Sequence, residues 1–211
     1  MRIGRTGLSR GPAVPDHGLD ASTAELEAVL EHTGRASVLE ISQAGPIAIA
    51  LAARRPDLVH RLVLMGTYAD GPATFPSTEL RDAAVGLVRS HPRLGTTMLA
   101  GLFRPGAGDE ASRLLAGVLR DSADPTTAAD YLAAVYSADV SAQLSQVRAP
   151  ALVLHYRADR LIPFRGGQQL AAGLPDARFV ALEGAYHLPD ARDLDTVADA
   201  VVAFLSQPES R

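Results

Sequence analysis

Short apolar runs that alternate with helical patterns constrain the fold of this chain more than any other feature of its sequence. Four runs have the length and apolar content of buried β-strands, at residues 36–42, 58–66, 149–157 and 177–184. Helical patterns lie before, between and after them, at about 22–32, 46–55, 167–172 and 193–205. Strands joined through helices run parallel, and the helices then cover the sheet. We therefore predict an α/β fold with a mostly parallel sheet and helices on both faces.

Residues 67–140 interrupt this alternation with helical patterns alone. Amphipathic segments at 78–91, 109–121 and 125–137 are separated by prolines and glycines. These segments lie between two predicted strands, so they form an insertion in the α/β pattern. We predict a single domain over residues 1–211, with a helical insertion at 67–140.

Composition excludes several classes of protein. The net charge is −4, so there is no basic excess with which to neutralise nucleic-acid phosphates. Cysteine is absent, which excludes disulfide scaffolds, thiolate metal sites and cysteine nucleophiles. The longest apolar run, at 46–53, is too short to cross a bilayer, and no targeting segment is visible. We therefore expect a cytoplasmic protein with no nucleic-acid or membrane partner.

Three polar residues directly follow predicted strands. Ser42 ends the first strand and opens a helix, Asp159 follows the third strand, and His187 follows the fourth. Ligands of parallel sheets bind at the carboxyl ends of the strands, so these side chains are expected at one rim. A serine hydroxyl is a weak nucleophile until a histidine takes its proton, and a carboxylate orients that histidine. The pattern therefore favours nucleophilic catalysis.

Each of these residues also has a purely structural interpretation. A serine at the start of a helix is commonly an N-cap. Asp159, with Pro163 downstream, also fits a turn. His187 fits a solvated loop histidine, and His155 is a rival base that we interpret as structural, because it lies at a strand end beside Tyr156. Only the combination of three residues in this order favours catalysis.

Three long tracts carry a family resemblance. They read ISQAGPIAIALAARRPDLVHRLVLMGTYA, DVSAQLSQVRAPALVLHYRADRLIPF and LPDARFVALEGAYHL. They resemble the α/β-hydrolase-fold superfamily, and most of all the bacterial hydrolase modules often fused to cyclase or helix-turn-helix regulatory domains. The resemblance implies Ser42 as nucleophile, Asp159 as acid and His187 as base, with the insertion at 67–140 as the family's helical lid. It implies neither a metal nor an organic cofactor.

The turn around the serine departs from the family pattern. The family's turn reads G-x-S-x-G, because strand and helix approach closely there and the serine backbone is strained. Here the window is EISQA, residues 40–44. Ala44 adds one methyl group, and Ala158 before the predicted acid is a similarly small change. Glu40 is the larger change, because its charged side chain must leave a crowded turn or be buried with a partner.

The chain is also short at its start compared with the family. About forty residues precede Ser42, whereas the family's nucleophile strand is its fifth, and residues 4–11 resemble the loop after the fourth strand. The first four strands are therefore expected to be missing, with the loop that supplies one oxyanion-hole N–H. The backbone N–H of Gln43 supplies the other. Loss of one such donor costs on the order of 10²–10³ in rate. His17-Gly18 lies in the wrong place to replace the lost loop.

Without its usual neighbour, the strand at 36–42 is expected at the edge of the sheet, with unpaired backbone groups. Three explanations stay open. The true start lies upstream of Met1, or the chain is a gene fragment, or a second copy covers the edge in a homodimer. The first two are preferred.

The sequence thus predicts a serine hydrolase that acts on a small ester, lactone or similar apolar acyl compound. The alternative is a catalytically impaired ligand-binding or sensory module, or a fragment of a longer hydrolase or regulator, which Glu40 and the missing loop favour. Apolar residues of the insertion either shape an apolar substrate pocket or pack its helices together, and packing is expected for most of them. These residues are Phe75, Met98, Leu102, Phe103, Tyr131 and Tyr136.

Overall fold

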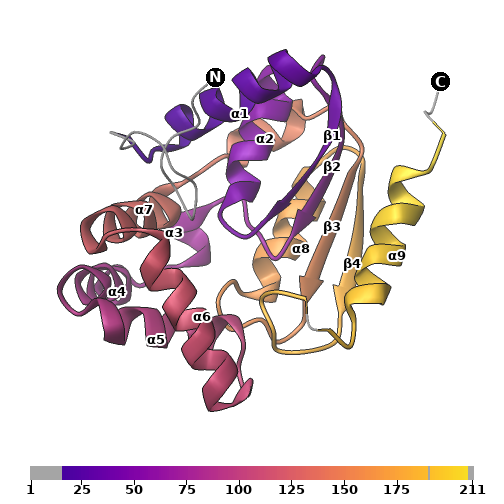
Figure 1. Ribbon diagram of the computed structural model, residues 1–211. Helices are drawn as coiled ribbons and strands as arrows, with labels where there is room; N and C mark the ends of the chain where they lie inside the picture. Colours follow the sequence, from indigo (N-terminus) through magenta and orange to yellow (C-terminus); the bar gives the residue numbers. More distant parts are fainter. Residues whose placement is uncertain (1–15, 190, 209–211) are drawn as a thin grey trace.

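A four-stranded parallel sheet forms the centre of the protein (Figure 1). The structure is a computed structural model that describes residues 16–189 and 191–208. The strands are β1 (Ala36–Ile41), β2 (Val59–Met65), β3 (Ala151–Tyr156) and β4 (Ala177–Leu182). They lie in the sheet in the order β1-β2-β3-β4, the same as their order along the chain. The predicted parallel α/β sheet is confirmed.

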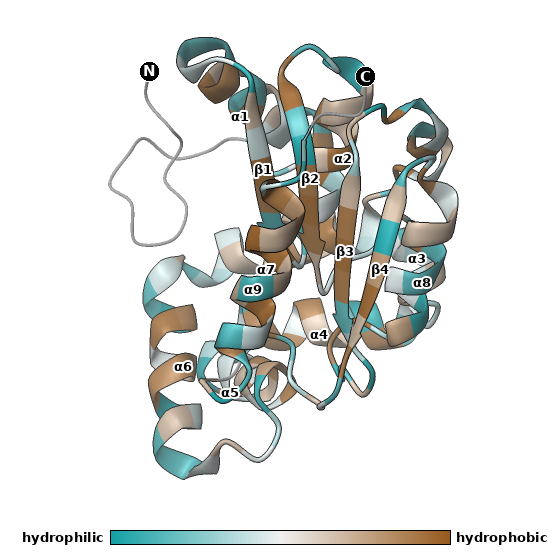
Figure 2. Cartoon of the chain, turned by 90° about the vertical axis from the view of Figure 1, so that its right-hand side faces the viewer, coloured by the Kyte–Doolittle hydropathy of each residue, from teal (hydrophilic) through white to brown (hydrophobic). Residues whose placement is uncertain are grey.

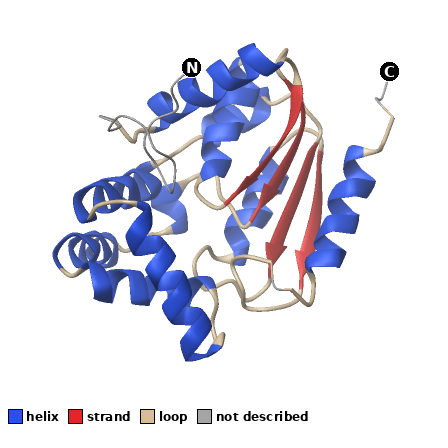
Figure 3. Cartoon of the chain, in the orientation of Figure 1, coloured by secondary structure: helices blue, strands red, loops and turns tan. Residues whose placement is uncertain are grey.

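Helices cover both faces of this sheet (Figure 3). On one face lie α2 (Ala44–Arg54) and α8 (Phe164–Gly173), with α1 (Leu19–Thr33) packed on α2. On the other face lies α9 (Leu194–Leu205). All four helices were predicted, but α1 begins at residue 19 rather than 22, and α8 is longer than its glycine-rich sequence suggested.

The alternation of side chains along β2 explains why each face carries its own core. Leu62 and Leu64 pack in the cluster that includes α2 and α8, whereas Val63 and Met65 pack in the cluster that includes α9. Successive side chains of a strand point to opposite faces, so a strand buried on both faces is apolar throughout. Figure 2 shows this as hydrophobic colour along β3 and along the second half of β2, beyond a hydrophilic band near the start of β2.

Five helices and a short 3-10 helix lie between β2 and β3. They are α3 (Gly71–Thr74), α4 (Thr78–Ser90), α5 (Pro92–Phe103), α6 (Gly108–Ser122), α7 (Pro125–Ser137) and the 3-10 helix at Ser141–Gln146. The segments predicted as α4, α6 and α7 are confirmed as helices, whereas α5 was not predicted. Helices α4 to α7 gather beyond the end of the sheet to which the strands point (Figure 1).

Strand β1 lies at the edge of the sheet and pairs with β2 alone among the described strands. The edge position predicted for this strand is therefore found in the described part of the chain. Leu39, in the middle of β1, is half exposed. The tract at 4–11 that was compared with a family loop lies outside the described residues.

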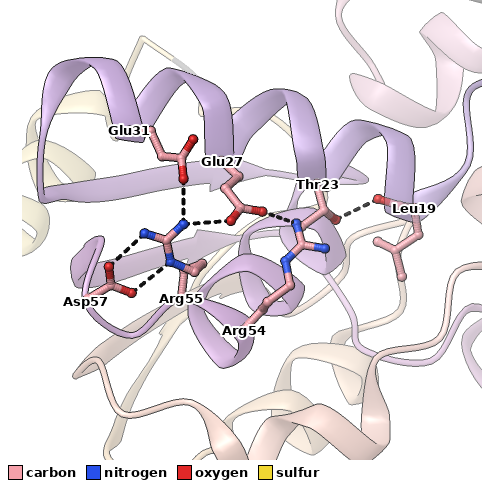
Figure 4. A network of polar contacts seen from close by, with 7 residues as sticks. All are labelled: Leu19, Thr23, Glu27, Glu31, Arg54, Arg55 and Asp57. Atoms are coloured by element: carbon pink, nitrogen blue, oxygen red, sulfur yellow. Dashed lines mark hydrogen bonds and ion pairs between the residues drawn. The ribbon is translucent and has the colours of Figure 1, made fainter.

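An ion-pair network fastens α1 to the end of α2 (Figure 4). The guanidinium of Arg55 donates to carboxylates of Glu27, Glu31 and Asp57 at 2.7–3.0 Å, and Arg54 donates to Glu27 at 2.6 Å. The glutamates lie in α1, Arg54 ends α2, and Arg55 and Asp57 lie in the turn that leads into β2, so the network joins α1 to the end of α2 across the intervening strand β1. None of the described helices has the length and apolar content needed to span a membrane.

Candidate active site

Ser42 occupies a sharp turn between β1 and α2. Its φ of 63° makes it the one non-glycine residue with positive φ in the described part of the chain. Its N–H donates to the carbonyl of Met65 at 2.9 Å, which ties the turn to the end of β2. A left-handed backbone at a residue other than glycine costs of order 1–3 kcal/mol and clusters at functional sites. The strained turn expected of a nucleophile is therefore present.

The interpretation of Ser42 as a helix cap is wrong. Helix α2 is capped by Gln43, and no side-chain cap hydrogen bond is made at its start. Ser42 is buried, with 6% of its surface exposed. Its hydroxyl is therefore available for chemistry at the carboxyl end of the sheet.

Close packing around this turn falls on Gly45 rather than on Ala44. A Cβ at position 45 would overlap the side chain of Thr67, so the backbone of α2 lies directly against the residue that follows the end of β2. Ala44 is only partly buried, which agrees with its methyl group being a mild departure from the family pattern. In this chain the position next to the turn that has no room for a Cβ is therefore 45.

Asp159 uses its two carboxylate oxygens differently. Oδ1 accepts hydrogen bonds from the N–H groups of Leu161 and Ile162 at 2.8 and 3.1 Å. Oδ2 lies 2.8 Å from Nδ1 of His187. Asp159 is therefore both a turn residue, through Oδ1, and the partner of a histidine, through Oδ2.

His187 is completely buried, and is not a solvated loop histidine. Its N–H donates to the carbonyl of Phe103 at 2.9 Å, and the Phe103 ring meets the imidazole edge to face at 5.1 Å. With Nδ1 bonded to Asp159, the imidazole is held as the tautomer that carries its proton on Nδ1. Nε2 has no hydrogen-bond partner in the described chain, so its lone pair remains available to accept a proton.

Ser42 and His187 flank the same turn at the end of β2. Ser42 is bonded to Met65, and the next residue, Gly66, lies against the imidazole of His187. The structure thus brings Ser42, Asp159 and His187 to one end of the sheet from β1, β3 and β4. No hydrogen bond joins the Ser42 hydroxyl to Nε2 here, and such bonds are often long until substrate binds.

A cavity of about 490 Å³ lies between Ser42 and the helices of the insertion. None of the described residues that line it is charged. Four of the six insertion residues singled out in the sequence line this cavity, so the expectation that most of them only pack helices together is wrong. The four are Phe75, Phe103, Tyr131 and Tyr136, whereas Met98 and Leu102 do not line it.

Gln43 lines the same cavity directly after Ser42. Its backbone N–H makes no hydrogen bond within the described part of the chain, so it is free to donate to an anionic oxygen. The side chain of Tyr131 lies nearby. Burial raises the pKa of the Tyr131 hydroxyl, an effect that a hydrogen bond with the Gln43 carboxamide opposes.

Glu40 stays half-buried at the turn, and no described residue forms an ion pair with it. Burial raises the pKa of its carboxyl to about 7. It lines a second cavity of about 250 Å³ together with Glu25, His17 and Tyr131. The side chain was expected either to leave the turn or to be buried with a partner. Among the described residues neither is found, and the raised pKa favours the neutral form of the carboxyl.

Sequence reasoning missed two features that shape the site. Gly66 has a φ of 54° and makes room for the imidazole, and its place directly after an apolar strand was the only signal for it. The carbonyl of Phe103 anchors the loop of His187, which no local pattern could indicate. In the described chain, no three acidic or histidine side chains are grouped so as to hold a metal ion.

Comparisons with known proteins identify the family to which this chain belongs. The family described as the alpha/beta hydrolase fold matches this chain over residues 6–189. The chain therefore belongs to the α/β-hydrolase family, and the resemblance to this family found in the sequence is confirmed.

Two relatives show how the chain compares in length. It is 30% identical over 201 residues to a pimeloyl-(acyl-carrier protein) methyl ester esterase from Nitrosomonas europaea. The matched region covers 90% of this chain and 79% of the esterase. It is 32% identical over 216 residues to the polyketide synthase ThaQ from Burkholderia thailandensis, and this match covers 95% of this chain. The chain spans only 10% of that synthase.

Solved structures share the fold. A hydrolase from Pseudomonas aeruginosa PA01 superposes with a TM-score of 0.82 at 25% identity, over 97% of this chain and 77% of the hydrolase. The enol-lactonase from Burkholderia xenovorans LB400 superposes with a TM-score of 0.80 at 23% identity, over 97% and 78% of the two chains. The latter likeness concerns the fold alone.

Proposed function

We propose that this protein is a serine hydrolase that acts on a small ester, lactone or similar acyl compound. Ser42 attacks the acyl carbon, and His187 takes the hydroxyl proton on Nε2 and returns it to the leaving group. Asp159 orients the imidazole and stabilises its charged form. The N–H of Gln43 stabilises the negative oxygen of the tetrahedral intermediate.

The observation that carries this proposal is the buried pair of Asp159 and His187. The 2.8 Å contact between Oδ2 and Nδ1 leaves Nε2 as the only free nitrogen of a fully buried ring. A buried imidazole with one nitrogen committed to a carboxylate and the other unpaired is arranged as a general base. Ser42, with its strained backbone, is the nucleophile that we propose, because its N–H is bonded to Met65 and the next residue, Gly66, lies against the imidazole.

The insertion at 67–140 is proposed as the lid over this site, and its cavity as the substrate pocket. The absence of charged side chains among its described lining residues favours an uncharged, apolar acyl group. The relative named as a pimeloyl-(acyl-carrier protein) methyl ester esterase is consistent with acyl transfer to water as the reaction class.

A fluorophosphonate probe tests the nucleophile directly. We expect it to label the protein, and the Ser42→Ala variant to remain unlabelled. Ser122→Ala is the matched control, because Ser122 lines the same cavity but donates its hydroxyl to the carbonyl of Val118. It should label like the unmodified protein. A folded protein that is not labelled, or labelling that survives Ser42→Ala, would refute the proposal.

A second candidate function is a non-catalytic ligand-binding or sensory module. Glu40 beside the nucleophile turn favours it, because above its pKa of about 7 the carboxyl is ionised and then opposes the negative charge of an acyl-transfer intermediate. Saturable binding of p-nitrophenyl octyl ether, without hydrolysis of p-nitrophenyl octanoate or fluorophosphonate labelling, would favour this function over the hydrolase.

A further inference from the structure

A second buried histidine lies beside the Asp159 carboxylate. His155 is the fifth residue of β3 and is completely buried. Its Nε2 lies 2.9 Å from the carbonyl oxygen of Ile162 and 3.6 Å from Oδ2 of Asp159. His155 is not among the residues that line the cavity, so it does not reach the proposed substrate site.

The surroundings of its ring assign the protonation state of His155. Nδ1 is buried without a hydrogen-bond partner in the described chain, and a Cβ at Gly167 would overlap it. A protonated ring would therefore bury an N–H that has no acceptor, at a cost of about 1–3 kcal/mol. Burial also lowers the pKa of His155. The ring is thus neutral, with its single proton on Nε2, and donates to the Ile162 carbonyl.

The peptide units of Ile162 connect His155 to the carboxylate. The N–H of Ile162 donates to Oδ1 of Asp159, and its carbonyl accepts from Nε2 of His155. Oδ1 is therefore held in the loop at 159–162, and the carboxylate plane cannot turn without breaking these bonds. This leaves Oδ2 facing Nδ1 of His187.

We propose that His155 is a positioning residue of this site, which holds the loop at 159–162 through Ile162 and thereby fixes the Asp159 carboxylate on His187. The proposal rests on the hydrolase function proposed above and adds to its three residues a support that acts only through the backbone of Ile162. His155 itself transfers no proton, because its only N–H is committed to a backbone carbonyl and its Nδ1 faces Gly167.

Two amide variants test this role as a matched pair. His155→Gln places its carboxamide nitrogen near the position of Nε2, and His155→Asn places it near that of Nδ1, where Gly167 lies. Both side chains are neutral and polar, and they differ mainly in where the donor is. We expect the downfield proton resonance of the Asp159–His187 hydrogen bond to persist in His155→Gln and to disappear in His155→Asn.

Kinetics with p-nitrophenyl butyrate provide a second readout. In His155→Asn, kcat should fall by about 10²-fold with little change in KM, because misplacement of a catalytic pair by about 1 Å costs that much. His155→Gln should retain a kcat close to that of the unmodified protein. An Asn variant that keeps both the resonance and kcat would overturn the proposal.

One measurement needs no variant at all, and covers the case in which His155→Asn does not fold. The ring ¹⁵N shifts of His155 in the unmodified protein should report a neutral ring with its proton on Nε2 at pH 7, and a proton on Nδ1 would overturn the proposal. The two proposals can fail separately. A resonance lost only in the Asn variant, in a protein without hydrolase activity, would retain the positioning role and reject the hydrolase.

Discussion

Gly66 lies directly against the imidazole of His187, and a Cβ at this position would stand 3.2 Å from Cε1 of the ring. Gly66 also has a φ of 54°, a conformation that side chains with a Cβ rarely adopt. Gly66 is therefore needed for two separate reasons, the space that the imidazole occupies and the backbone conformation. It lies between the strained serine turn and the buried histidine.

The first prediction concerns Gly66→Ala. The left-handed backbone should cost about 1–2 kcal/mol in the free energy of unfolding, measured by urea denaturation. The added methyl group should also displace the imidazole and slow fluorophosphonate labelling by about 10²-fold. Gly101→Ala is the control, because a Cβ there meets nothing within 4 Å and lies inside α5. This variant should raise the free energy of unfolding by about 0.5–1 kcal/mol, and the fluorophosphonate should label it at the normal rate.

The second prediction concerns Glu40, whose carboxyl pKa is raised from 4.5 to about 7 by burial. Between these values the folded chain keeps a proton that the unfolded chain releases, so stability falls as the pH rises through this window. Glu40→Gln removes this loss. Because the side chain is partly solvated, we expect a gain of about 1–2 kcal/mol at pH 8, which shrinks toward pH 5. Urea denaturation at the two pH values measures it, and an equal gain at both would contradict the assignment.

The third prediction concerns the size of the cavity. Ala128 lines it, so Ala128→Phe should fill part of the space and favour short acyl chains. The ratio of kcat/KM for p-nitrophenyl decanoate over butyrate should fall by about 10-fold or more. Ala133→Phe is the control, since Ala133 lies exposed on the same helix and outside the cavity lining. If both variants change the ratio equally, the cavity does not select the acyl chain.

The fourth prediction concerns the network around Arg55 (Figure 4). Arg55 donates to three carboxylates, whereas Arg54 donates to Glu27 alone among the pairs found. Arg55→Gln should therefore lower the midpoint of thermal unfolding more than Arg54→Gln does. Partly exposed ion pairs are screened by salt, so the difference should shrink in 1 M NaCl. A difference that is unchanged by salt would indicate that packing, rather than charge, fastens α1.

Most of the fold was predictable because its signals are local. The apolar strands and helices α1, α2, α8 and α9 are encoded in residues a few positions apart, as periodicity and as breaks at glycine and proline. Helix α5 shows where this fails. It begins with Pro92 and contains Gly95 and Gly101, a poor helical sequence, yet a Cβ at Gly95 would stand 2.8 Å from Cα of Val88 in α4. The close approach of two helices selects glycine there, and only tertiary packing explains it.

The candidate site likewise has some features that the sequence predicts and others that only tertiary packing explains. By itself, the sequence determined that Ser42, Asp159 and His187 each follow a strand, because strand ends are local features and parallel strands end on one side. Tertiary structure alone decided which oxygen of Asp159 meets His187, that His155 bonds to the loop, and that burial raises the pKa of Glu40. Those contacts join side chains from segments far apart in the chain, so their distances depend on how the sheet, the loops and the insertion pack together.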